Sequence, residues 1–270
     1  MDRIASALSL EKGRLMNNIL LEICCGSLDD AIEAERGGAD RVELCSALFL
    51  GGLTPSFGTI VEAKARLKIS IMVMIRPRGG GFCYSEAEMA AMERDATMVI
   101  EQGADGLVFG ILTSKGEIDV ERSRRMKTIA KDKQTVFHRA FDVTPEPFKS
   151  LDQLVDLGIT RVLTSGQQRS VPEGVDLIRE LREYAQARIE VLPGGGIKPH
   201  NLRDVLERTG CNQVHLTAFE RRTDTSTQAR PEITFGRAVY PSEMEYEATN
   251  STLVAEIKSL CRSHADLRGK

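Results

Sequence analysis

The sequence predicts a single-domain (β/α)8 barrel, a closed ring of eight parallel strands surrounded by helices. Eight short apolar segments alternate with helical segments along the chain, and a glycine-capped turn recurs before every second strand. The length of 270 residues is usual for one such domain. A doubly wound open sheet is the alternative, but the regular recurrence of the turn favours the closed ring.

The strand candidates are rich in Val, Ile and Leu, as buried parallel strands are. They cover residues 19–25, 40–46, 70–76, 106–110, 134–139, 161–166, 189–192 and 213–216. The recurring turns begin at Gly38, Gly103, Gly158 and Gly210, and a glycine there is typical of the end of a helix. Each turn therefore predicts a helix before it and a buried strand after it.

The helix candidates lie between the strands and after the last one. They cover residues 28–36, 56–67, 85–102, 119–131, 146–157, 172–187, 199–209 and 252–264. Ser85 followed by Glu88 is the pattern of a capping box, in which each side chain accepts a backbone N–H of the other residue. Pro172 and Pro199 suit the first turn of a helix, where the missing N–H costs nothing.

The barrel is expected to cover residues 19–266 without an internal boundary. Residues 1–18 form a short N-terminal extension, and residues 267–270 form a tail. Residues 221–250 are polar and separate the last strand from the last helix, so we expect a long loop without regular structure. This loop either caps the barrel mouth, makes a subunit contact, or is an ordinary mobile surface loop.

Composition argues against several classes of partner. The net charge is −3, basic and acidic residues are mixed, and the chain has no tryptophan, so no nucleic-acid partner is expected. No apolar run approaches the ~18 residues of a membrane span, so no membrane partner is expected. The six cysteines do not form the dense pattern of a secreted scaffold, and no secretion signal precedes them. Reduced thiols in the cytoplasm are therefore expected.

The first two strand candidates combine an apolar face with a polar one. Alternate residues of a strand point the same way, so Leu21 and Ile23 share one face, while Glu22 and Cys24 share the other. The second strand repeats the pattern, with Glu43 and Cys45 on its polar face. A strand buried on both faces is normally almost continuously apolar. The repeated exception predicts a polar, functional interior.

Active sites of (β/α)8 barrels form at the C-terminal ends of the strands. Glu22 and Glu43 lie near two of these ends, Arg76 ends the third strand, and His138 lies near the end of the fifth. We expect the acids to face Arg76, as general acid and base beside an anion-binding guanidinium, with His138 as a proton carrier. The alternative for the acids is a buried layer of ion pairs without a catalytic role.

Cys24 and Cys45 occupy matching positions on what should be adjacent strands. Two thiolates within reach of each other suit a soft ion such as Cu(I), and they also suit a redox pair. The alternative is that each cysteine is a small buried hydrophobic residue. The cysteine spacing alone leaves these possibilities open.

Gly194, Gly195 and Gly196 follow the seventh strand and lead into a helix. Barrels often bind phosphate with the loops after strands seven and eight, and glycine lets the backbone approach an anion. The loop therefore predicts a site for a small anionic or phosphorylated metabolite, unless it is only a tight turn. No organic cofactor motif is evident, and no lysine at a strand end supports Schiff-base chemistry.

The chain resembles the CutC copper homeostasis family. The resemblance rests on segments that recur in order between residues 19 and 220: LEIC (21–24), ERGGADRVELCSAL (35–48), GGLTPS (51–56), VMIRPRGGGFCYS (73–85), GADGLVFG (103–110), TVFHRAFD (135–142), RVLTSG (161–166) and LPGGGIKPHNL (192–202). The fit is poorer in residues 1–18 and 221–250.

The resemblance implies a (β/α)8 barrel, a cytoplasmic and also a nuclear location, and a homo-oligomer, either dimer or tetramer. It also implies a role in copper homeostasis, with Cu(I) as the bound metal at Cys24 and Cys45. Copper binding alone does not explain Arg76 or the glycine loop. The alternative function is therefore an enzyme that acts on a small anionic metabolite through carboxylate and histidine acid–base chemistry.

Overall fold

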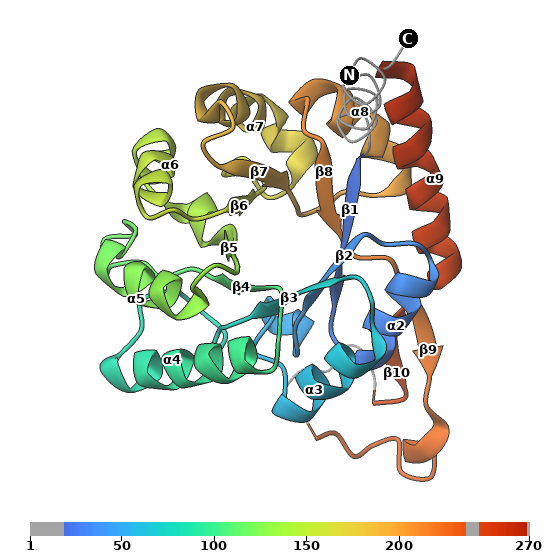
Figure 1. Ribbon diagram of the computed structural model, residues 1–270. Helices are drawn as coiled ribbons and strands as arrows, with labels where there is room; N and C mark the ends of the chain where they lie inside the picture. The colour runs from blue at the N-terminus through green and yellow to red at the C-terminus, as the bar shows by residue number, and fades with distance from the viewer. Residues whose placement is uncertain (1–18, 236–242, 269–270) are drawn as a thin grey trace, which may run out of the picture.

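The computed structural model describes residues 19–235 and 243–268, and it confirms the predicted barrel (Figure 1). Eight parallel strands form the sheet in the order β7-β6-β5-β4-β3-β2-β1-β8. The strands are β1 (Leu20–Cys25), β2 (Arg41–Leu44), β3 (Ser70–Met74), β4 (Gly106–Phe109), β5 (Gln134–Phe137), β6 (Arg161–Thr164), β7 (Glu190–Pro193) and β8 (Gln213–Leu216). A parallel bridge between Gly194 and His215 closes the ring between β7 and β8.

A helix follows every strand, as predicted, and Figure 1 shows the helices arranged around the strands. The helices are α2 (Leu28–Arg36), α3 (Phe57–Arg66), α4 (Glu86–Glu101), α5 (Val120–Ala130), α6 (Pro147–Asp156), α7 (Val171–Ala185), α8 (Pro199–Thr209) and α9 (Ser251–Arg268). The predicted capping box at Ser85 and Glu88 is present, because each side chain accepts the backbone N–H of the other residue.

The two faces of β1 and β2 separate as the alternation predicts. Leu21, Ile23, Val42 and Leu44 are fully buried and belong to the core between the strands and the helices. A second apolar cluster fills the inside of the ring, and it consists of Cys24, Cys45, Met72, Met74, Val108, Val136, Leu163 and Leu192. The thiols therefore point into the barrel and not toward the helices.

The register between β1 and β2 differs from the expectation that Cys24 and Cys45 lie at matching positions. Cys24 is paired with Glu43, and Glu22 is paired with Arg41. Cys45 therefore lies two residues farther along its strand than the partner of Cys24. Strands of a closed barrel are staggered because they tilt against its axis, and this stagger cannot be read from one strand at a time.

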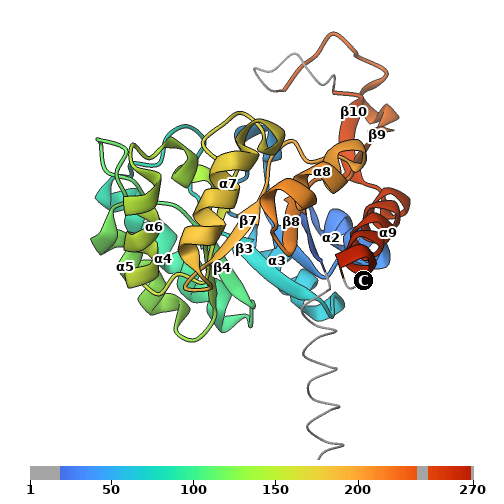
Figure 2. The same ribbon diagram turned by 90° about the horizontal axis from the view of Figure 1, so that it is seen from above.

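Regular structure is present within residues 221–250, contrary to what the sequence suggested. β9 (Phe219–Thr223) and β10 (Glu245–Thr249) form an antiparallel hairpin that projects from the body of the molecule (Figure 2). The base of the hairpin is tied to α2, because the Thr249 N–H donates to Asp30 Oδ1 at 2.6 Å. The predicted extension at residues 1–18 lies outside the described residues, as does residue 269 onward.

None of the helices in residues 19–235 and 243–268 combines the length and the apolar character that a membrane span requires.

Candidate metal centre

The inner faces of β1 and β2 bring two thiols and one carboxyl group together. Glu43 Oε2 lies 3.3 Å from Cys24 Sγ and 3.4 Å from Cys45 Sγ. The three ligand atoms all lie within 4.8 Å of one another. Cys24 is 8% exposed and Cys45 is 1% exposed, so the group lies inside the barrel and out of contact with bulk water. The geometry suits an ion held by both sulfurs.

The loop between β2 and α3 covers these thiols. Leu48 packs against the inner cluster that contains Cys24 and Cys45. Gly52 has a φ of +84°, and a Cβ placed on it would lie 3.2 Å from Cys45 Sγ. The backbone therefore passes directly over the sulfur, in a conformation that glycine adopts without strain.

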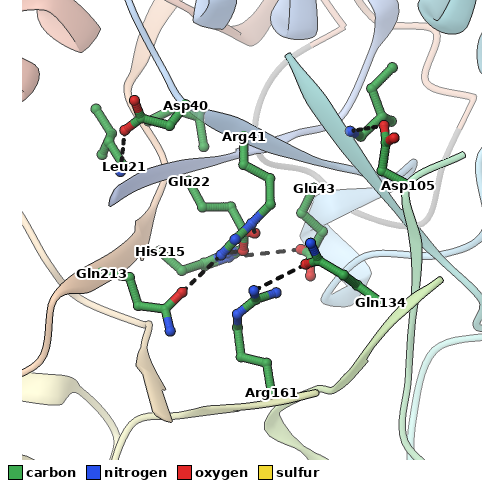
Figure 3. A network of polar contacts seen from close by, with 12 residues as sticks. Leu21, Glu22, Asp40, Arg41, Glu43, Asp105, Gln134, Arg161, Gln213 and His215 are labelled. Carbon is green, nitrogen blue, oxygen red and sulfur yellow. Dashed lines mark hydrogen bonds and ion pairs between the residues drawn. The ribbon is translucent and has the colours of Figure 1, made fainter. Parts of the chain in front are cut away.

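A histidine that the sequence analysis left without a role lies beside the thiols. His215 on β8 places Nδ1 at 2.7 Å from Glu22 Oε1 and Nε2 at 3.8 Å from Glu43 Oε2. Arg41 forms an ion pair with the other oxygen of Glu22 and donates to Gln213 Oε1 at 3.0 Å. Figure 3 shows the Arg41 guanidinium between Glu22 and Gln213, with His215 beside them.

The network continues toward the N-terminal ends of the strands. Arg161 donates to Gln134 Oε1 at 3.1 Å and to Glu190 Oε2 at 2.7 Å. A cavity of about 380 Å³ lies at this end and is lined by Arg41, Arg161 and Asp40, among others. This cavity lies at the opposite end of the barrel from the thiols. The buried charges around it are paired, as expected of a structural layer.

The charges of the inner network shift the pKa values of Glu22 and His215 in opposite directions. Burial raises the pKa of Glu22, but the Arg41 guanidinium and His215 more than offset this effect and hold the pKa well below its usual range. Burial alone would lower the pKa of His215, yet the neighbouring acids Glu43, Cys24 and Glu22 raise it well above the ordinary value. His215 is therefore an imidazolium at neutral pH, and Glu22 holds it in place.

The two thiols differ in acidity. The hydrogen bond from Cys45 is the main cause that lowers the pKa of Cys24 to about 5, against the effect of burial, and His215 contributes. The same hydrogen bond and burial raise the pKa of Cys45 well above its usual range. Burial and the Cys24 charge raise the pKa of Glu43. Without a metal, the site therefore favours a thiolate at Cys24 and disfavours charge on Cys45 and Glu43.

Arg76 does not face Glu22 and Glu43, contrary to expectation. Its guanidinium donates to three backbone carbonyls, those of Leu50 at 2.8 Å, Gly52 at 3.1 Å and Gly80 at 2.7 Å. These carbonyls belong to the loops after β2 and β3. Arg76 therefore joins the loop that covers the thiols to the neighbouring loop. Arg41, and not Arg76, is the arginine that forms an ion pair with Glu22.

His138 lies away from the thiols. Its Nδ1 accepts the backbone N–H of Ala140 at 3.1 Å, and its ring lies 5.0 Å from that of Phe82. Burial, together with the Arg76 charge, lowers the pKa of His138 to about 3. The imidazole is therefore neutral at physiological pH. The structure does not bring it together with Glu22 and Glu43.

The glycine loop joins β7 to the helices around it. Gly194 donates to Thr164 O at 3.0 Å, and Gly195 O accepts the Val171 N–H at 2.8 Å. A Cβ on Gly195 would lie 3.0 Å from the Arg139 guanidinium, so a half-exposed cation rests on this loop. That this loop binds an anion stays a prediction. Judged by the distance from a Cβ on Gly195, Arg139 is the cation that lies closest to the loop.

His215 and Arg41 were absent from the predicted site for different reasons. Alternation along β8 placed His215 on the polar face with Gln213, so its inward direction was available from the sequence. Its partner Glu22 lies 193 residues away, and only closure of the ring brings the two together. Arg41 begins its strand, and its pairing with Glu22 follows from the stagger between β1 and β2.

Comparisons with known proteins agree with the resemblance. Residues 19–220 match the model of the CutC family. The chain is 49% identical over 246 residues to a CutC family protein of Treponema denticola, covering 91% of this chain and all of that one. It is 41% identical over 252 residues to the human protein named copper homeostasis protein cutC homolog, covering 93% of this chain and 92% of the human protein.

A solved structure of CutC from Streptococcus agalactiae superimposes with a TM-score of 0.71 at 43% identity, and the match covers 74% of this chain and 98% of that one. The residues matched by the family model include the thiols and their polar neighbours. The chain belongs to the CutC family.

Proposed function

We propose that this protein binds one Cu(I) ion through the thiolates of Cys24 and Cys45, as a copper homeostasis protein. The observation that carries the proposal is the convergence of both sulfurs on one buried point, with all ligand atoms within 4.8 Å. Thiolates are soft ligands and suit Cu(I). The name of the human relative, a copper homeostasis protein, supports the same assignment.

The protonation of the site suits capture of a monovalent cation. Cys24 already provides a thiolate at neutral pH, since its pKa is lowered to about 5. Cys45 must lose its proton when the ion binds, because only the thiolate is a good ligand. Two thiolates and Cu(I) together carry a charge of about −1, and the neighbouring His215 imidazolium balances it. A cytoplasmic setting would keep both thiols reduced, and Cys24 and Cys45 are both free of disulfides.

An anaerobic titration of the full-length protein with Cu(I) tests this proposal. We expect saturation near one ion per chain, in competition with a chromophoric Cu(I) chelator, and loss of this binding in the Cys24→Ser, Cys45→Ser double variant. Cys261→Ser is the matched control, because Cys261 is a buried thiol on α9 and outside the site. Equal Cu(I) affinity of the double variant and the parent would refute the proposal.

An enzyme acting on a small anionic metabolite is the second candidate. The specific observation in its favour is the chain of contacts from Glu22 through His215 toward Cys24, in which a carboxylate orients an imidazolium beside a thiolate. The predicted anion ligand Arg76 is occupied by loop carbonyls, so the structure supports this candidate less well. A screen for thermal stabilisation by phosphorylated metabolites tests it, and no stabilisation across a broad set would remove its support.

A further inference from the structure

We infer that the thioether of Met74 is a third sulfur ligand for Cu(I), beside Cys24 and Cys45. This inference rests on the proposed function and adds a ligand and a basis for metal selectivity. It follows from the strand register, from where the side chain of Met74 ends, and from the chemistry of the groups that compete with it. The sequence alone does not predict a methionine ligand, because the chain has no methionine-rich motif.

The register of β2 and β3 places Met74 beside Cys45. Glu43 is paired with Met72, and Leu44 is paired with Val73. The next residues along these parallel strands are Cys45 and Met74. Both point into the barrel, because both belong to the inner cluster that contains Cys24. Side chains of laterally paired residues on one face of a sheet lie in contact range.

The methyl end of the Met74 side chain and the thiol of Cys45 lie next to the same residue, Gly52. A Cβ placed on Gly52 would lie 3.2 Å from Cys45 Sγ and 3.5 Å from Met74 Cε. The two sulfur-bearing side chains therefore converge on the same spot beneath the loop that covers the site. Met74 is 4% exposed, so the thioether is withdrawn from water together with the thiols.

Met72 belongs to the same strand and the same inner face, yet its side chain ends elsewhere. A Cβ on Gly106 would lie 2.2 Å from Met72 Cε and 2.9 Å from its Sδ. The thioether of Met72 therefore lies over the glycine of β4, on the side away from β2. The chain thus supplies its own matched control, a buried methionine two residues away that does not end at the thiols.

The other polar groups of the site are poorer ligands for a soft ion. Glu43 offers a hard oxygen, which suits a soft ion poorly. The Nδ1 atom of His215 already contacts Glu22 Oε1 at 2.7 Å. A thioether is soft and neutral, so it adds a ligand without adding buried charge. Three sulfur ligands favour Cu(I) over ions that prefer oxygen and nitrogen.

X-ray absorption at the copper edge of selenomethionine-labelled, full-length protein tests the inference. The protein is loaded anaerobically with one equivalent of Cu(I). We expect a selenium neighbour of copper in the parent and in Met72→Leu, and no selenium neighbour in Met74→Leu. Leucine and methionine have similar volumes, so both variants should fold, and unfolding midpoints check this.

Affinity measured by chelator competition gives a second readout. Met74→Leu should bind Cu(I) about tenfold or more weakly, the scale on which groups around a metal tune its affinity, while Met72→Leu should bind like the parent. Copper without a selenium neighbour in the labelled parent would overturn the role of Met74 and leave the two-thiolate site intact. Cu(I) binding that survives loss of both cysteines would instead overturn the proposed function, and the inference with it.

Discussion

Toward the C-terminal ends of the strands, the interior of the barrel has two sides of different chemistry. On β8, β1 and β2 the inward side chains are polar or sulfur-containing, and we call His215, Glu22, Cys24, Glu43 and Cys45 the polar arc. On β4 to β7 the inward side chains of the inner cluster are aliphatic, and we call Val108, Val136, Leu163 and Leu192 the apolar arc.

The apolar arc determines how the polar arc behaves. Aliphatic side chains across the ring exclude water, so the charges of the polar arc interact in a medium of low dielectric constant. For this reason, burial contributes strongly to the pKa shift of every titratable group in the polar arc. The chemistry of the thiols therefore depends on both arcs, because the polar arc contacts them and the apolar arc excludes water from them.

The largest expected effect comes from breaking the polar arc at Glu22. Glu22→Gln removes the charge that Arg41 and His215 share, so Arg41 loses its counterion and His215 loses one of the acids around it. We expect the free energy of unfolding at neutral pH to fall by about 3–5 kcal/mol, measured by urea denaturation. Glu62→Gln on α3 is the control, because its ion pair with Arg66 is exposed and worth about 0.5 kcal/mol. Equal losses in the two variants would contradict a buried network.

A smaller effect is expected from the apolar arc. Val136→Ala on β5 deletes two buried methyl groups and leaves a cavity. We expect a loss of about 2 kcal/mol in the free energy of unfolding, with Cu(I) stoichiometry unchanged. Urea denaturation and the anaerobic titration measure the two quantities on the same preparation. If stoichiometry fell with stability, the apolar arc would have to act on the metal directly.

The sharpest test of the polar arc concerns the acidity of Cys24. The difference in thiolate absorbance between the metal-free parent and Cys24→Ser should titrate with a midpoint of about 5. Cys45→Ala, which has no hydrogen-bond donor at this position, should move this midpoint upward toward the ordinary value of ~8.5, because the Cys45 hydrogen bond is the main cause of the shift. A midpoint that stayed near 5 in Cys45→Ala would assign the shift to His215.

The sign of the corresponding change in stability follows from linkage. The folded protein binds the Cys24 proton more weakly than the unfolded chain does. The contribution of Cys24 to stability is therefore fully present above the unfolded pKa of ~8.5, and it is lost as pH falls through about 5.

Much of the fold could be predicted because its signals are local. The turns at Gly38 and Gly103, with the apolar segments that follow them, each depend on residues close in sequence. The inward direction of Glu22 and Cys24 follows from alternation along a single strand. These features need no knowledge of how one element meets another, and the structure confirms them.

The arrangement of the site could be predicted only in part, because it depends on relations between strands and loops. The stagger that pairs Cys24 with Glu43 is a property of the closed ring. Arg76 donates its hydrogen bonds to loop carbonyls, and this arrangement depends on the paths of two loops. The hairpin of β9 and β10 was missed because its apolar signal is short: β9 has one apolar residue, Phe219, and β10 alternates only at Tyr246 and Ala248.

The loop held by Arg76 has a consequence for how long an ion stays. Leu48 packs against the inner cluster that holds both cysteines, and Gly52 lies over Cys45. A single guanidinium, that of Arg76, holds the carbonyls of Leu50 and Gly52 in this segment. If the proposed copper binding holds, the opening of this tethered segment would slow the exchange of the ion, as suits a store better than a fast carrier.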